Sequence, residues 1–170
     1  MKNINRKKQL FFDFGRDYDA DFDNFFFSRK NKILKSELEN FLNGETSQNI
    51  FLTADNGNGK TFLLNSILNH KHMQDLKVIY IDVALLNEDK NYFIELSDFD
   101  LICLDNIHKT LKSIEVQIFN LINQCKNSST NLLFASGKHP NDLNFLPDLV
   151  SRFKAFKQYR IHSIADDDVT

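Results

Sequence analysis

The sequence predicts an α/β fold, in which one domain is built on a five-stranded parallel sheet with helices on both faces. Short apolar runs without polar alternation recur along the chain, and such runs are typical of strands that are buried on both faces. Segments with apolar residues at helical spacing separate these runs, as the crossover helices of a parallel sheet require. The chain has 170 residues, which fits one domain at roughly 100–200 residues per domain.

The predicted elements follow one another in strand and helix order. The first helix is expected over residues 31–42 and ends at Gly44. Its apolar residues define the face expected to be buried: Ile33, Leu34, Leu38, Phe41 and Leu42. The apolar runs predict strands over 50–52, 78–81, 101–104, 132–135 and 159–161. Two further helices are expected over 62–68 and 114–125, and a short one opens at Pro147.

Composition and charge argue against several classes of protein. The formal net charge of -2 and a pI of about 6.2 show no basic excess of the kind that nucleic-acid-binding domains carry. No apolar stretch approaches the roughly 20 residues of a membrane span. The apolar run near the N-terminus stops at Asp13, too soon for a secretory leader. Cys103 and Cys125 lie in apolar periodic segments, so we expect buried, reduced thiols and a cytoplasmic protein.

A glycine-containing turn between the first strand and the next helix carries the clearest chemistry. Gly59, Lys60 and Thr61 stand where a phosphate-binding P-loop must stand, after a strand and at a helix start. Backbone N–H groups there can hold phosphate oxygens, and Gly57 and Gly59 let the main chain approach them. We expect Lys60 to reach the phosphates of ADP or ATP and Thr61 to bind Mg²⁺. The expected nucleotide-binding residues are Ala54, Asp55, Asn56, Gly57, Asn58, Gly59, Lys60, Thr61 and Phe62.

An acidic motif follows the third predicted strand. Asp105 comes directly after four apolar residues, as in a Walker B strand, and is the second expected Mg²⁺ ligand, directly or through water. The next residue, Asn106, can position a water molecule through its amide but cannot accept its proton. The sequence therefore predicts weak or absent intrinsic ATP hydrolysis, with Asn106 as a degenerate water-positioning residue. The structural alternatives are an ordinary strand–turn–helix at the P-loop and an ordinary strand end at Asp105.

Together these motifs resemble the DnaA branch of the AAA+ P-loop NTPases, over the chain from Gln9 to Thr170. The resemblance implies a nucleotide-binding base domain over 21–170, with residues 21–25 near the adenine. It implies that Arg152 is an arginine finger acting in trans on a neighbouring subunit's nucleotide; a surface or salt-bridged arginine is the alternative. It also implies an acidic sensor where Gly137 stands, and a helical lid that we expect this chain to lack.

Within that branch, the chain resembles the Hda subfamily of replication regulators. Ala54 at the start of the P-loop, Asp105 followed by Asn106, and residues 143–149 before Arg152 carry this resemblance. An N-terminal tail, expected over 1–20, contains a peptide similar to the subfamily's clamp-binding motif: Gln9, Leu10, Phe11, Phe12, Asp13 and Phe14. A glutamine can hydrogen-bond at a pocket rim while the apolar side chains anchor the peptide. The alternative is that these phenylalanines pack against the domain.

The resemblance implies a bacterial, nucleoid-associated protein that binds the DNA polymerase sliding clamp and promotes hydrolysis of DnaA-bound ATP. ADP or ATP with Mg²⁺ would be its cofactors, and DNA would be contacted only through the clamp, with homodimer formation left open. One alternative is a helicase loader of the DnaC class, which would usually keep an acid where Asn106 stands. Another is an interaction scaffold whose nucleotide site is vestigial.

Overall fold

A five-stranded parallel sheet forms the centre of the chain. The computed structural model describes residues 16–25, 27–45, 48–55, 59–87, 90–94 and 96–162. The strands are β1 (Ile50–Thr53), β2 (Val78–Asp82), β3 (Leu101–Asp105), β4 (Asn131–Ser136) and β5 (Lys157–Arg160). They lie in the order β2-β3-β4-β1-β5, and every neighbouring pair is parallel. The predicted fold class, an α/β protein with a parallel five-stranded sheet, is confirmed.

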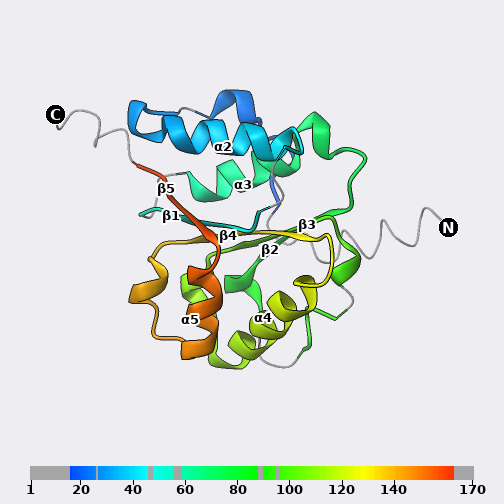
Figure 1. The fold of residues 1–170 in the computed structure, drawn as a ribbon, viewed down its shortest axis with the longest axis vertical. Helices are drawn as coiled ribbons and strands as arrows, with labels where there is room; N and C mark the ends of the chain where they lie inside the picture. The colour runs from blue at the N-terminus through cyan, green and yellow to red at the C-terminus, as the bar shows by residue number, and fades with distance from the viewer. Residues whose placement is uncertain are drawn as a thin grey trace.

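Helices cover both faces of this sheet. Helices α2 (Lys32–Leu42) and α3 (Lys60–Leu68) lie on one face, and α4 (Lys112–Cys125) and α5 (Pro147–Lys154) lie on the other (Figure 1). Short 3-10 turns connect these elements: η1 (Phe22–Asn24), η2 (Arg29–Asn31), η3 (Lys71–Met73), η4 (Val83–Leu85), η5 (Leu96–Asp98), η6 (Ile107–Lys109) and η7 (Pro140–Asp142). The expectation of an absent helical lid concerns residues beyond His162, outside the described ranges.

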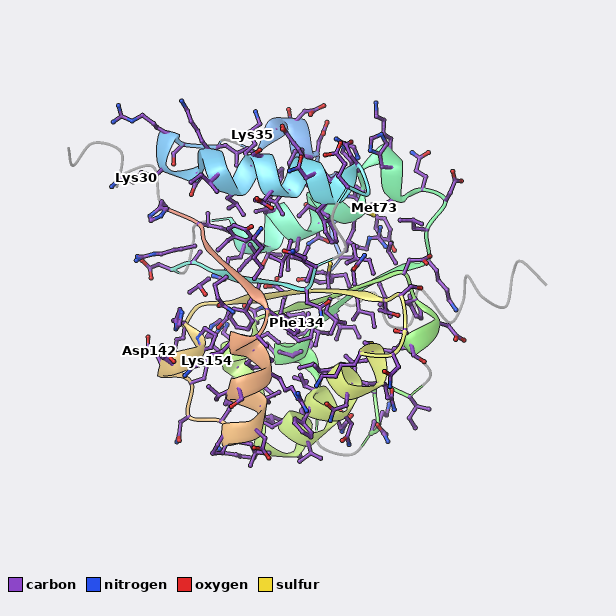
Figure 2. The ribbon with its side chains drawn as sticks, in the orientation of Figure 1. Lys30, Lys35, Met73, Phe134, Asp142 and Lys154 are labelled. Atoms are coloured by element: carbon purple, nitrogen blue, oxygen red, sulfur yellow. The ribbon has the colours of Figure 1, made fainter. Side chains whose placement is uncertain are left out.

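The core consists of two apolar layers, one on each side of the sheet. Successive residues of a strand point to opposite faces. Ile50 and Leu52 of β1 therefore join the cluster formed with α2 and α3, whereas Phe51 joins the cluster formed with α4 and α5. Phe134 of β4 lies in the second cluster, between the sheet and these two helices (Figure 2). This double burial explains why the strands appear in the sequence as continuous apolar runs.

Helix α2 starts one residue later than predicted, and one residue of its expected buried face is misplaced. Leu34 and Leu38 are buried, but 74% of the Ile33 side chain is exposed. Successive helical residues are about 100° apart, so Ile33 lies outside the stripe that Leu34 and Leu38 define. The helix ends as predicted near Gly44, which has a φ of 72° and donates its N–H to the Phe41 carbonyl.

The segment before η1 packs against α3. The Asp17 N–H donates to Asn65 Oδ1 at 2.9 Å, and Asn69 Nδ2 donates to the Ala20 carbonyl at 2.9 Å. Residues 16–20 are therefore part of the packed domain, although the sequence places them in the tail. Cys103 and Cys125 are buried, reduced cysteines, as predicted. In the described ranges, no helix has the length and hydropathy needed to cross a bilayer.

Candidate functional site

The two expected Mg²⁺ ligands meet where the carboxyl end of β3 faces the first turn of α3. Thr61 Oγ1 donates a hydrogen bond to Asp105 Oδ2 at 2.6 Å. The residues are 44 positions apart in the sequence, and the parallel sheet brings them together. A hydroxyl and a carboxylate oxygen are the kinds of ligand that Mg²⁺ prefers in nucleotide sites. The residues therefore fit this ion, although direct and water-mediated coordination would both be compatible with them.

Lys60 lies on the first turn of α3, at the position where a P-loop lysine binds phosphate. It is 6% exposed, and its Nζ donates to the Ala54 carbonyl at 3.1 Å. Burial lowers the pKa of Lys60, while the negative charges of Asp105 and Asp55 act in the opposite direction. A desolvated ammonium group at a helix N-terminus gains most from an anionic ligand. The local chemistry therefore suits a phosphate group.

Gly59 is the N-cap of α3, and both its backbone and its surroundings favour glycine. Its φ of 83° lies in the left-handed region, and a Cβ there would be 2.9 Å from Phe25 Cε2. Phe25 also stacks on Phe62, with ring centroids 6.2 Å apart and an interplanar angle of 23°. These aromatic rings give the loop an apolar border, which suits a nucleotide base. Asn56, Gly57 and Asn58 of the predicted loop lie outside the described residues.

Ala54 and Asp55 carry the chain from β1 toward the P-loop. Ala54 is buried, and its N–H donates to the Ser136 carbonyl at the end of β4, at 3.1 Å. Asp55 is exposed, and its Oδ2 lies 3.8 Å from a guanidinium nitrogen of Arg160 on β5. A cavity of about 420 Å³ opens beside these two residues and Gly137. The loop therefore starts at the end of β1, which lies between β4 and β5, and it starts beside this cavity.

Tyr80 is a partner of Asp105 that the sequence analysis missed. Its hydroxyl, on β2, donates to Asp105 Oδ2 at 2.7 Å, and its side chain is buried. Burial raises the pKa of Tyr80, and the negative charge of Asp105 raises it further. The phenol therefore stays protonated and can hold Asp105 in place. A hydroxyl in the otherwise apolar run 78–81 is the only sequence signal for this role.

Asn106 is held by a second carboxylate, from the neighbouring strand. Its backbone is left-handed, with a φ of 57°, and its Nδ2 donates to Asp82 Oδ1 at 2.9 Å. Asp82 ends β2 in register with Asp105 at the end of β3. The amide nitrogen is thus engaged, which leaves the carbonyl oxygen as the group that could accept a hydrogen bond from water. An amide oxygen is a poor base, so weak hydrolysis remains the prediction.

Exchanging the amide and the acid should create a more active ATPase. We expect the double variant Asn106→Asp with Asp82→Asn to hydrolyse ATP about 10-fold to 100-fold faster than the parent chain, because a carboxylate then occupies the water-positioning place. Asn106→Asp alone should gain less, since two carboxylates would face each other at hydrogen-bond distance. Multiple-turnover phosphate release measures both, with Asp82→Asn alone as the control. A single variant faster than the double variant would contradict the assigned role of Asp82.

The remaining candidates are Arg152, Ser136 and the clamp-binding peptide. Arg152, on α5, places its guanidinium carbon 5.5 Å from the centre of the Phe119 ring of α4. Within the described part of the chain, Arg152 has no carboxylate partner, so the salt-bridged alternative is not what the structure contains. Ser136, after the apolar part of β4, bonds with the backbone of Lys138. The predicted clamp-binding peptide, residues 9–14, is outside the described ranges.

Comparisons with known proteins agree with this arrangement. The sequence model described as the bacterial DnaA ATPase domain matches residues 17–156. A Haemophilus influenzae protein described as uncharacterized is 30% identical over 155 residues, which are 88% of this chain and 66% of that protein. This chain therefore spans slightly less than two thirds of that relative.

Solved structures share the fold at low sequence identity. AMPPCP-bound DnaA from Aquifex aeolicus is 23% identical, with a TM-score of 0.72 over 87% of this chain and 51% of that chain. A DnaI structure is 14% identical, with a TM-score of 0.71 over 86% of this chain and 89% of that chain. The chain thus spans about half the length of the DnaA structure and most of the DnaI structure.

Proposed function

The chain belongs to the bacterial DnaA ATPase domain family, and from this premise we propose that it binds an adenine nucleotide with Mg²⁺ and regulates replication initiation. One observation carries this proposal. Thr61 and Asp105 are hydrogen-bonded beside the buried Lys60, whereas the next position holds Asn106 in place of an acid. The first feature favours nucleotide binding, and the second disfavours rapid hydrolysis. Such a protein would hold its nucleotide as a stable part of its structure.

Each part of the nucleotide has a group suited to it. The backbone N–H groups at the start of α3 and the Lys60 ammonium would bind the phosphates. Thr61 and Asp105 would hold Mg²⁺, which when bound neutralises charge between the phosphates. Tyr80 keeps Asp105 in position through its hydroxyl. Phe25 and Phe62 offer an apolar surface for the adenine.

We further propose an Hda-like role, in which the chain acts on a partner's ATP instead of its own. In this role, residues 9–14 bind the sliding clamp and Arg152 approaches ATP bound to DnaA. The guanidinium would stabilise charge on the transferred phosphoryl group. Asn106 supports the proposal because a protein that activates a partner does not need its own water-activating acid. The conversion of DnaA to its ADP-bound form would then prevent renewed initiation.

The test is hydrolysis of labelled ATP that has been bound to DnaA beforehand. We expect the full chain together with DNA-loaded sliding clamp to accelerate hydrolysis, and each component alone to have little effect. The double variant Gln9→Ala with Leu10→Ala should lose the acceleration, because the peptide's polar contact and one apolar anchor are removed. Its nucleotide affinity should remain unchanged, since both residues lie outside the P-loop motif.

A helicase loader is the competing function. The structural likeness to DnaI agrees with it only at the level of fold. Capture of the full chain by a replicative helicase, together with unchanged hydrolysis of DnaA-bound ATP, would overturn the regulatory proposal and favour loading. Capture by the clamp that depends on Gln9 and Leu10 would support regulation.

A further inference from the structure

His108 lies against the loop that follows β4, close to the proposed phosphate site. It belongs to η6 (Ile107–Lys109), three residues after Asp105, and the Gly137 N–H donates to its Nδ1 at 2.8 Å. Strands β3 and β4 are neighbours in the sheet (Figure 1), so the residues after them meet at its carboxyl edge. Sequence motifs gave His108 no role.

The hydrogen bond from Gly137 determines which ring nitrogen of His108 carries the proton. Because Nδ1 accepts a hydrogen bond, the neutral ring must carry its proton on Nε2. Burial lowers the pKa of His108, and the positive charges of Lys60, Lys109 and Lys138 lower it further, while the negative charge of Asp105 acts in the opposite direction. At neutral pH the ring therefore presents Nε2–H as a donor. Within the described ranges, no acceptor bonds to Nε2.

The His108 ring lies next to the position that a side chain on residue 137 would take. A Cβ built on Gly137 would lie 3.0 Å from both Cε1 and Nε2 of the ring. Any side chain at position 137 would therefore compete with the imidazole. The ring therefore lies where a side chain at position 137 would begin.

The ring also lies at the same edge of the sheet as the start of α3. It is three residues after Asp105, which accepts the hydrogen bond from Thr61 at 2.6 Å, and Thr61 follows the lysine that would bind the phosphates. The P-loop and the β4 end are tied by the hydrogen bond from the Ala54 N–H to the Ser136 carbonyl, at 3.1 Å. An uncharged donor with a fixed tautomer thus lies at the edge of the sheet where the P-loop begins.

We propose that His108 donates its Nε2–H to the terminal phosphate of a bound nucleoside triphosphate, and so helps the site to distinguish a triphosphate from a diphosphate. The inference rests on the proposed nucleotide site and adds one contact to it. Nδ1 binds the Gly137 N–H, which keeps the ring oriented, and Nε2–H binds a phosphate oxygen. No proton needs to be transferred, because the ring acts only as a hydrogen-bond donor.

Calorimetric titration of the full chain with Mg²⁺ and either ADP or a non-hydrolysable ATP analogue tests this proposal. His108→Ala should weaken binding of the triphosphate analogue about 10-fold, the usual effect of losing a hydrogen bond to a charged group. Binding of ADP should change less than about 2-fold. His108→Gln should recover most of the triphosphate affinity, because its amide oxygen can accept from Gly137 while its nitrogen donates.

Gly137→Ala is an independent variant that leaves the histidine in the sequence. Its methyl group would push the ring away by a few tenths of an ångström, so we expect a smaller loss of triphosphate affinity in the same direction. The role of His108 would be overturned if the ratio of triphosphate to ADP affinity were unchanged in both His108→Ala and Gly137→Ala. That result would not contradict the proposed nucleotide site. Failure of the parent chain to bind either nucleotide would overturn the nucleotide site and this inference together. Circular dichroism of each variant verifies that it is folded.

Discussion

Replacing Lys60 with alanine should weaken binding of both ADP and ATP by about 100-fold or more. The ammonium group is buried, and among the described residues it donates a hydrogen bond to a neutral acceptor, the Ala54 carbonyl. Phosphate oxygens would replace that weak partner by strong anionic ones, and each hydrogen bond to a charged group contributes about 1.5–3 kcal/mol. Two such bonds correspond to a change in affinity of at least two orders of magnitude.

The same substitution should not destabilise the nucleotide-free chain. Burial lowers the pKa of Lys60, so removal of the buried charge opposes the loss of its packing and of its hydrogen bond, and the free energy of unfolding should change little. Isothermal titration with each nucleotide and urea denaturation measure the two effects. Lys109→Ala is the matched control, since it removes an exposed cation of η6 and should change affinity by no more than about 5-fold. Equal affinities for Lys60→Ala and the parent chain would contradict a P-loop function.

The central strands were predictable because a strand that is buried on both faces is a continuous apolar run in the sequence. β1 and β3 consist largely of residues that fill the two apolar layers. β5 (Lys157–Arg160) is an edge strand with exposed or half-buried polar residues. Its apolar signal is weak, and the predicted strand is therefore shifted: residues 159–161 were expected, but the strand begins two residues earlier. The misassigned face of Ile33 has a different cause, since an apolar residue next to a buried stripe looks like part of it.

The residues of the site also fall into two groups. A local sequence motif indicates some of them, and the others depend on contacts between segments that are distant in the sequence. Lys60 and Thr61 follow from a local motif, and Asp105 follows from its place after an apolar strand. Tyr80 and Asp82 come from β2, and their roles depend on the register between β2 and β3, which no local pattern reveals. A comparison of strand ends could have suggested Asp82, because β2 and β3 both end in aspartate.

Arg152→Ala should reduce stimulation of DnaA-bound ATP hydrolysis by about 1000-fold, the lower end of the range for an arginine finger. The guanidinium of Arg152 contacts an aromatic ring, and a contact with a phosphate could replace this weak interaction at a small cost in free energy. Its contact with the Phe119 ring, at 5.5 Å, is a cation–π interaction worth about 0.5–1 kcal/mol. No ion pair within the described ranges would have to break before the side chain reached a neighbouring nucleotide. The chain's own nucleotide affinity should be unaffected, because Arg152 lies on α5 and not in the P-loop.

Two further variants distinguish an arginine-finger role from a simple loss of positive charge. One is a conservative substitution of Arg152, and the other replaces a neighbouring cation. Arg152→Lys should recover only a small part of the activity, because an ammonium group lacks the planar fork that binds two phosphate oxygens at once. Lys154→Ala removes an exposed cation two residues further along α5 (Figure 2) and should leave stimulation intact. The measurement is single-turnover hydrolysis of DnaA-bound ATP with DNA-loaded clamp. If Arg152→Ala stimulated hydrolysis as strongly as Lys154→Ala, Arg152 would be a surface residue packed on Phe119, and the regulatory proposal would need another group to act on the partner's ATP.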